Sequence, residues 1–276
     1  WNPRESEPSQ TYFADLPDGV SQKAYDCFAS PYRVVFVADA TRDAYAALNT
    51  RHNFTVVRNG LDQTRIQQTS EEWLPAQARQ SIGACDGEVV ILLLGTVCPR
   101  KGQQDLVKAL AQLSPDLQKR VRCYIVGDRP SEYSAGLHAL VAQLPSELRS
   151  RMHLVPETRQ TARYYRAADL FVCTSQLESY PRVVLEAMAY GLPIVTTPVF
   201  GIREQVREGV NALFYEAGDS GALADRLRRL LQDEALRARL ASKSASVLAL
   251  GTDFDEMVSS YAEIFAEAWL SGGPLS

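Results

Sequence analysis

The chain has 276 residues and a formal net charge of −4, with 46% hydrophobic and 22% charged residues. This is the composition of an ordinary soluble globular protein, long enough for one large domain or one and a half. The mild acidity argues against general nucleic-acid binding. The sequence also lacks the apolar run of about 18 residues that would predict a membrane span.

The five cysteines are odd in number, scattered and without the spacing of a zinc site. They favour a reduced, cytoplasmic setting and predict no metal site. No signal peptide is visible, and we interpret the opening run WNPRESEP as a cut end.

Residues 1–50 predict only part of a domain. Residues 32–38 (YRVVFVA) have the apolar character of a buried strand, and Asp39 or Thr41 can cap a helix over residues 42–48. One strand and two helices cannot bury a core alone. We therefore interpret residues 1–50 as the remnant of a larger N-terminal domain.

Strands and helices alternate regularly from residue 51 onward. A strand at residues 54–57 and a turn at Asn59-Gly60 precede a helix within residues 67–84. Further strands are predicted at residues 89–94, 121–126, 153–155, 169–173, 193–197 and 211–215. Further helices are predicted at residues 102–113, 131–143, 161–168, 182–190, 218–231, 234–248 and 254–270. This alternation predicts an α/β fold with a Rossmann-like, doubly wound parallel sheet.

One loop and helix concentrate the chemically informative residues. Residues 174–181 form a polar loop between a strand and the helix that begins at Arg182, at the carboxyl edge where parallel sheets bind ligands. Glu178 lies in this loop and Glu186 about one turn into the helix, while the N–H groups of Arg182 to Val184 form a helix N-terminus suited to phosphate. For two arbitrary glutamates, a helix cap and a solvated surface residue would be the simpler interpretation.

A second phosphate-binding candidate follows the strand at residues 89–94. The run GTVCPRKG, residues 95–102, places Arg100 and Lys101 at the same edge of the sheet. It is neither a Walker P-loop nor a dinucleotide fingerprint. Taken alone, the two cations are more simply interpreted as solvated surface charges.

Together these motifs resemble the donor site of retaining glycosyltransferases of the family 4 type. ESYPRVVLEAMAYGLPIV is similar to the family's E-x7-E pair followed by EAMA-x-G-x-P-V, and GTVCPRKG to its G-R-x4-K-G loop, with Thr96 in place of Arg. The resemblance implies a GT-B fold. It implies that Glu178 contacts the donor sugar, that Glu186 holds the ribose hydroxyls, and that Arg100 and Lys101 hold the diphosphate.

The resemblance extends the predicted site beyond these four residues, with Glu178, Arg100 and Lys101 as its catalytic members. The donor sugar and phosphates are assigned to Gly95, Thr96, Ser179, Tyr180, Pro181, Arg182 and Val183. The nucleobase region is assigned to Gly127, Asp128, Pro156, Glu157 and Thr158, although Asp128 is equally consistent with a turn residue. Glu204 lies in a run similar to the family's G-G-x-x-E and is as consistent with a structural ion pair. Arg4 stands where many relatives have a histidine.

The resemblance also implies a domain plan and an activity. Residues 1–50 would be a remnant of the acceptor domain, residues 51–252 the nucleotide-sugar-binding domain, and residues 253–276 a helix returning toward the acceptor domain. The whole enzyme would transfer a sugar from a nucleotide-diphosphate sugar to an acceptor hydroxyl with retention, without a metal or other cofactor. A nucleotide-sugar 2-epimerase and a non-catalytic nucleotide-sugar-binding module are the alternatives.

The partners of this activity are only partly defined. The acceptor is left open between a glycan, a lipid and a protein, and peripheral membrane association of the full enzyme is left open too. We expect the isolated chain to be weak or inactive. We also expect it to self-associate through the apolar stripe of its last helix, formed by Phe254, Met257, Tyr261, Ile264, Phe265 and Ala268.

Overall fold

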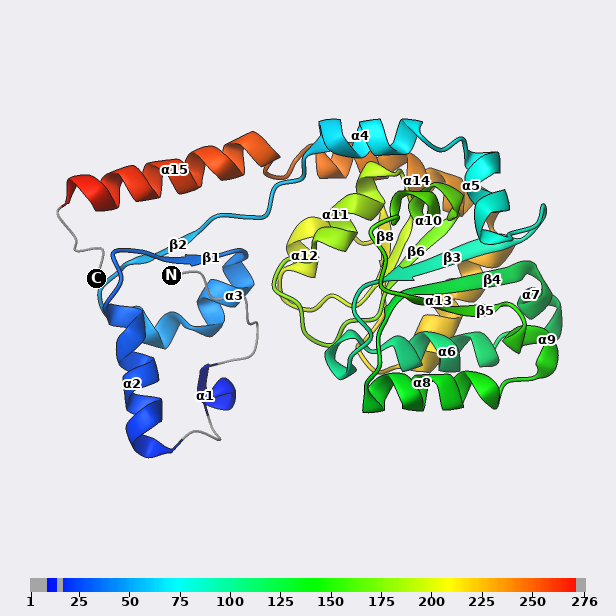
Figure 1. The fold of residues 1–276 in the computed structure, drawn as a ribbon, viewed down its shortest axis with the longest axis horizontal. Coiled ribbons are helices and arrows are strands. Elements are labelled where there is room, and N and C mark those ends of the chain that lie inside the picture. Colours follow the sequence, from blue (N-terminus) through cyan, green and yellow to red (C-terminus); the bar gives the residue numbers. More distant parts are fainter. Residues whose placement is uncertain (1–8, 14–16, 272–276) are drawn as a thin grey trace.

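The computed structural model describes residues 9–13 and 17–271, so the prediction for Arg4 lies outside the described residues. The chain forms a small N-terminal body and a large α/β domain, which are joined by the segment after β2 and again by the chain leading into α15 (Figure 1). No helix among the described residues is long and apolar enough to cross a membrane.

The large domain is built on a six-stranded, fully parallel sheet with the order β5-β4-β3-β6-β7-β8. The strands are β3 (Val89–Leu94), β4 (Val121–Asp128), β5 (Met152–Pro156), β6 (Leu170–Cys173), β7 (Ile194–Thr196) and β8 (Ala212–Phe214). The chain runs outward from β3 to one edge and then returns to build the other half from β6. This order confirms the predicted Rossmann-like, doubly wound sheet, and it places the switch point between β3 and β6.

Helices cover both faces of the sheet, which explains why β3 is apolar throughout. Val89, Ile91 and Leu93 belong to one buried core, whereas Val90 and Leu92 belong to the other. The first core is closed by α6 (Gln103–Ala111), α7 (Pro115–Arg120), α8 (Glu132–Ala142), α9 (Ser146–Arg149) and α13 (Ser220–Gln232). The second is closed by α10 (Ala162–Ala167), α11 (Arg182–Ala189) and α12 (Ile202–Gln205). Helix α14 (Glu234–Leu248) contributes to both.

Some predicted boundaries were wrong. The helix expected within residues 67–84 is two helices, α4 (Gln63–Glu71) and α5 (Pro75–Ile82), with Trp73 and Leu74 in the break between them. Proline restricts the residue before it to extended backbone, so Leu74 cannot continue a helix into Pro75. The short helices α7, α9 and α12 were not predicted from the sequence.

The N-terminal body has a second strand and therefore a small core of its own. It contains α1 (Ser9–Tyr12), α2 (Asp18–Ala29), β1 (Val34–Phe36), α3 (Asp39–Ala44), the 3-10 turn η1 (Ala46–Leu48) and β2 (Phe54–Val56). Strand β2 pairs in parallel with β1, so the domain boundary predicted at residue 50 cuts through this sheet and is wrong in that detail. Phe28, Phe36 and Tyr45 are among the largest fully buried side chains.

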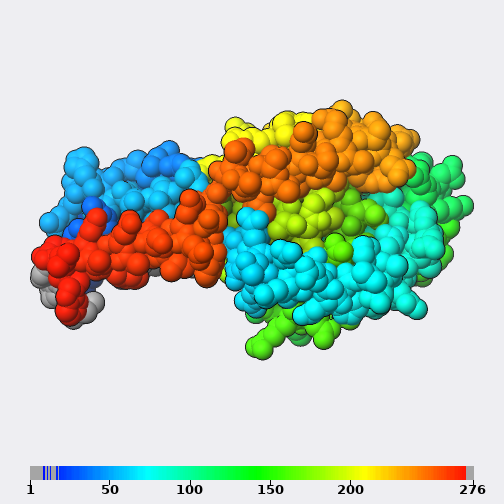
Figure 2. All heavy atoms as spheres, turned by 90° about the horizontal axis from the view of Figure 1, so that it is seen from above, coloured from blue at the N-terminus to red at the C-terminus, as the bar shows by residue number. Residues whose placement is uncertain are grey.

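Helix α15 (Phe254–Leu270) runs alongside the N-terminal body (Figures 1 and 2). Glu267 accepts a hydrogen bond from Tyr32 Oη at 3.3 Å and lies 3.8 Å from Arg33. Met257, Tyr261, Ile264 and Ala268 of the predicted stripe are half-covered. Phe265 and Trp269, in contrast, are 70% and 74% exposed. The helix therefore turns its apolar stripe only partly toward this body.

Candidate functional site

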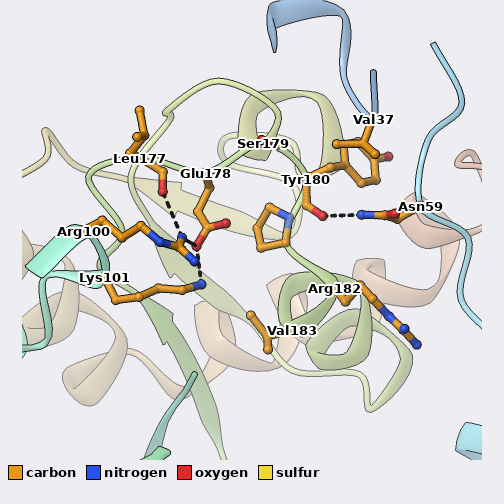
Figure 3. Close-up of a pocket in the computed structure, with 11 residues that line it drawn as sticks. Val37, Asn59, Arg100, Lys101, Leu177, Glu178, Ser179, Tyr180, Arg182 and Val183 are labelled. Carbon is orange, nitrogen blue, oxygen red and sulfur yellow. Dashed lines mark hydrogen bonds and ion pairs between the residues drawn. The ribbon is translucent and has the colours of Figure 1, made fainter. Parts of the chain in front are cut away.

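A cavity of about 270 Å³ opens at the carboxyl edge of the large sheet, between the two bodies. Its lining comes from four segments that are far apart in sequence: Val37, Asn59, Arg100, Lys101 and residues 177–183 (Figure 3). The predicted residues Glu178, Ser179, Tyr180, Pro181, Arg182 and Val183 all contribute to it. Val37 and Asn59 were missed, because they come from the N-terminal body and the linker.

The loops after β3 and β6 are held tightly together beneath this cavity. Thr174 Oγ1 donates to the carbonyl of Lys101 at 2.6 Å, and the N–H of Gln176 donates to the carbonyl of Arg100 at 2.8 Å. Gly102 has a φ of +61°, and a Cβ there would lie 2.4 Å from the carbonyl oxygen of Thr174. Only glycine fits this position without moving the loop, so the backbone fixes where both cations begin.

One carboxylate oxygen of Glu178 binds both cations of the site. Its Oε1 accepts from Arg100 Nη1 at 3.0 Å and from Ser175 Oγ at 3.3 Å, and it forms an ion pair with Lys101. The side chains of Glu178 and Lys101 are only 9% and 12% exposed, whereas that of Arg100 is 51% exposed. Glu178 is therefore not a helix cap. It is a buried anion that neutralises the two cations predicted to hold phosphate.

The first turn of α11 follows directly and offers fewer free donors than predicted. The N–H of Val184 donates to the carbonyl of Pro181 at 3.2 Å, so its predicted availability to a ligand was wrong. Helix α11 has no side-chain cap. The N–H groups of Arg182 and Val183 make no hydrogen bond within the described part of the chain. They form the positive end of the helix.

Glu186 lies one turn deeper and has a different environment. Tyr165 Oη donates to its Oε2 at 2.9 Å. Burial raises the pKa of Glu186, although the bond from Tyr165 and the charges of Arg182 and Arg65 oppose this shift. Glu186 does not line the cavity as delimited above. Tyr165 was not identified from the sequence, because no local pattern indicates which side chain of α10 reaches across to α11.

The predicted nucleobase region lies at the ends of β4 and β5, outside the cavity lining. Asp128 accepts from Ser134 Oγ at 2.6 Å and lies 2.7 Å from His138 Nε2. Burial alone would raise the pKa of Asp128, but these two bonds outweigh it and the pKa is lowered. Arg129 donates to Thr96 Oγ1 at 3.1 Å, so the loops after β3 and β4 are in contact.

Glu204 has the structural role that was one of its two predicted interpretations. Its carboxylate accepts from the N–H groups of Asp39 at 3.2 Å and Ala40 at 2.8 Å, and pairs with Arg58 at 3.0 Å. Glu204 thus caps α3, a role predicted for Asp39 or Thr41. It also ties the N-terminal body to the large domain. Beside it, Asn59 Nδ2 donates to the carbonyl of Tyr180 at 2.8 Å.

Among the described residues, no group of three or more His, Cys, Asp or Glu side chains could hold a metal ion. The cations that face Glu178 are Arg100 and Lys101. What the arrangement offers chemically is a cationic cluster, a helix N-terminus and two carboxylates along one sheet edge. These suit an anionic ligand with neighbouring hydroxyl groups.

Comparison with known proteins identifies relatives that are similar in sequence. The chain is 34% identical over 247 residues to a D-inositol 3-phosphate glycosyltransferase of Salinispora arenicola, matching 85% of this chain and 53% of the relative. It is 29% identical over 189 residues to an N-acetyl-alpha-D-glucosaminyl L-malate synthase of Bacillus anthracis, matching 68% of this chain and 48% of that one. The chain thus spans about half the length of these curated relatives.

Solved structures agree on the fold. The Anabaena protein Alr3699/HepE, in complex with UDP and glucose, superposes with a TM-score of 0.80 at 23% identity, covering 96% of this chain and 70% of that one. The model of the family described as "Glycosyl transferases group 1" matches residues 76–247, which is more than half of the chain. The chain therefore belongs to the group 1 glycosyl transferases.

Proposed function

We propose that the whole protein is a retaining glycosyltransferase of the family 4 type, and that this chain supplies its donor-binding half. The observation that supports this most is the cluster of Arg100, Lys101 and Glu178 beside the first turn of α11, with Glu186 on the same helix. A nucleoside diphosphate sugar has the matching groups in order: a sugar, two phosphates and a ribose.

Each residue has a defined role in this proposal. Arg100 and Lys101 neutralise the diphosphate, together with the N–H groups of Arg182 and Val183, and stabilise the charge that develops on the leaving phosphate. Glu178 accepts a hydrogen bond from a sugar hydroxyl, and Glu186 accepts bonds from the ribose. The protein's own cations do the neutralising, so the proposal needs no metal or other cofactor.

The relatives support a nucleotide sugar as the ligand. Alr3699/HepE was solved with UDP, with UDP and glucose, and with UDP-glucose. We use UDP and GDP as the first probes, because the nucleobase region of this chain does not by itself select a base. The acceptor stays open between a glycan, a lipid and a protein.

We further propose that the N-terminal body is part of the acceptor domain, and that α15 returns to pack on that domain. The ion pairs of Arg58 and Glu204 and the bonds of Glu267 support this arrangement. This chain alone should bind donor and transfer little sugar. All five cysteines are free in the structure, and the cytoplasmic setting remains a proposal.

The decisive experiment has two arms. Calorimetric titration of this chain with UDP and GDP in EDTA should give binding. The donor-site assignment is wrong if neither nucleotide gives heat or a thermal shift. In the full-length protein, product formed from an acceptor separates a transferase from a binding module, and turnover of the nucleotide sugar without acceptor indicates an epimerase. The anomeric configuration of the product, read by NMR, tests retention.

A further inference from the structure

The carboxylate of Glu186 is held by one neutral partner. Within the described residues, the only hydrogen bond it accepts comes from Tyr165 Oη, which reaches Oε2 at 2.9 Å. The other nearby contact of this hydroxyl, to the carbonyl of Val183, is longer at 3.4 Å. The single phenolic proton is therefore directed at Glu186, and Oε1 is left to accept from a ligand.

Tyr165 is itself fixed on all sides. It is 2% exposed and its ring stacks on Tyr190 with a centroid distance of 5.0 Å and an interplanar angle of 7°. Phe171 of β6 lies against the ring as well, with a centroid distance of 6.0 Å. Tyr190 Oη is in turn 3.4 Å from Thr69 Oγ1 on α4. These contacts hold the ring of Tyr165 in place, so the position of its hydroxyl oxygen is set before any ligand arrives.

The electrostatics of the pair are consistent with a neutral donor and a charged acceptor. Burial, reinforced by the charge of Glu186, raises the pKa of Tyr165 well above its usual value, so the phenol keeps its proton. Burial also raises the pKa of Glu186, and the Tyr165 bond opposes this shift. The other charged groups that face Glu186 are Arg182 on α11 and Arg65 on α4, and both favour the ionised carboxylate.

We propose that Tyr165 is a positioning residue for the ribose: it holds Glu186 Oε2 so that Oε1 points at the vicinal hydroxyls of the bound nucleotide. This inference rests on the proposed function and assigns a role to a residue that does not line the cavity. Its chemistry predicts dependence on two adjacent hydroxyls of the ligand, which separates it from a general effect on folding.

The test compares wild type, Tyr165→Phe and the control Tyr164→Phe. Tyr164 lies on the same helix, is also buried and also loses one hydroxyl, but its oxygen contacts Arg163 at 3.3 Å and not Glu186. Dissociation constants are measured between pH 5 and pH 8 for UDP and GDP, and for the 2′,3′-dideoxy form of whichever binds more tightly.

Tyr165→Phe should weaken the ribonucleotide roughly tenfold and leave the dideoxynucleotide unchanged, because only the ribonucleotide uses the oriented carboxylate. As the pH is lowered, the affinity of Tyr165→Phe for the ribonucleotide should begin to fall at a higher pH than that of the wild type. The variant lacks the hydrogen bond that favours the ionised form of Glu186. Tyr164→Phe should change neither the ratio of the affinities for the ribonucleotide and the dideoxynucleotide nor the pH dependence of binding. An equal loss for both ligands, or no loss, would overturn the positioning role. Absence of binding by the wild type would overturn the proposed function with it.

Discussion

The two glutamates of the loop and helix after β6 have seven residues between them and opposite surroundings. Glu178 is buried among charges, with Arg100 and Lys101 bound to one of its oxygens. Glu186 is half-buried beside a neutral phenol and forms no ion pair within the described residues. The first carboxylate is therefore already neutralised by the groups that should bind phosphate, whereas the second keeps an oxygen available.

This difference has a consequence for the order of events. Under the proposed function, a diphosphate that binds Arg100 and Lys101 replaces Glu178 as their anion, and the released carboxylate then accepts from a sugar hydroxyl. Glu186 needs no such exchange. On this proposal the phosphate end of the site couples two ligand groups, while the ribose end acts alone.

The largest effect should come from Lys101→Met. Lys101 is the better buried of the two cations, so its charge-assisted bonds to phosphate are the strongest in the site, and the affinity for UDP or GDP should fall about a hundredfold. The control is Lys108→Met, since Lys108 is exposed on α6. Titration calorimetry measures both, and unchanged affinity in Lys101→Met would remove this lysine from the phosphate site.

A third carboxylate, Glu88, tests whether a cation cluster alone indicates a binding site. It directly precedes β3, at the amino ends of the strands and thus opposite the carboxyl edge that holds the cavity. It accepts from Arg122 at 2.6 Å and from Arg151 at 2.6 Å. Burial would raise the pKa of Glu88, but Arg122 and the N–H of Cys85 outweigh it and lower the pKa to about 2. We expect its role to be purely structural.

Glu88→Gln should therefore reduce the free energy of unfolding by about 2 kcal/mol and leave nucleotide affinity unchanged. The pKa of Glu88 in the folded protein is below the value of about 4.3 that is usual for an unperturbed glutamate. The contribution of Glu88 to the free energy of unfolding is therefore complete above that pH and should be lost as the pH falls from about 4 toward 2. Denaturant unfolding at pH 7 and pH 3 measures this, and a variant that loses as much stability at both would contradict the assigned cause.

Glu186→Gln should weaken nucleotide binding about tenfold, because the ribose loses a bond to a charged group. Helix stability should hardly change, since Gln forms helices nearly as well as Glu. The wild type should accordingly prefer a ribonucleotide to its 2′-deoxy form. If the two bind the wild type equally, Glu186 does not contact the ribose.

The smallest expected change is also opposite in sign. Glu178→Gln removes the internal competitor for Arg100 and Lys101, so the affinity for the free nucleoside diphosphate should rise a few-fold, while transfer by the full-length protein should fall. Glu132→Gln, at an exposed position on α8, is the matched control. A loss of nucleoside diphosphate affinity in Glu178→Gln would show that no such competition exists.

The sequence predicted the sheet and the loop positions, because alternation fixes which strand ends share an edge. It therefore placed Glu178, Arg100 and Lys101 together correctly. It could not show that they are bonded to one another, since this depends on side-chain length and burial. Tyr165 and Asn59 were missed because they reach the site from elements that are adjacent only in the folded chain. The break before Pro75, in contrast, could have been predicted from the sequence, because a proline restricts the residue before it.

The two chain segments that connect the bodies, the linker after β2 and the segment leading into α15, meet at Gly60. The linker and the start of α15 touch there: Leu61 pairs with Asp253, and a Cβ at Gly60 would lie 2.0 Å from the carbonyl oxygen of Asp253. The N–H of Gly60 also donates to Met257 Sδ at 3.3 Å. The two connections therefore form one joint, and Gly60 lies one residue from Asn59 in the cavity wall. Because only a residue without a side chain fits there, any substitution of Gly60 must shift the two connections apart next to the cavity.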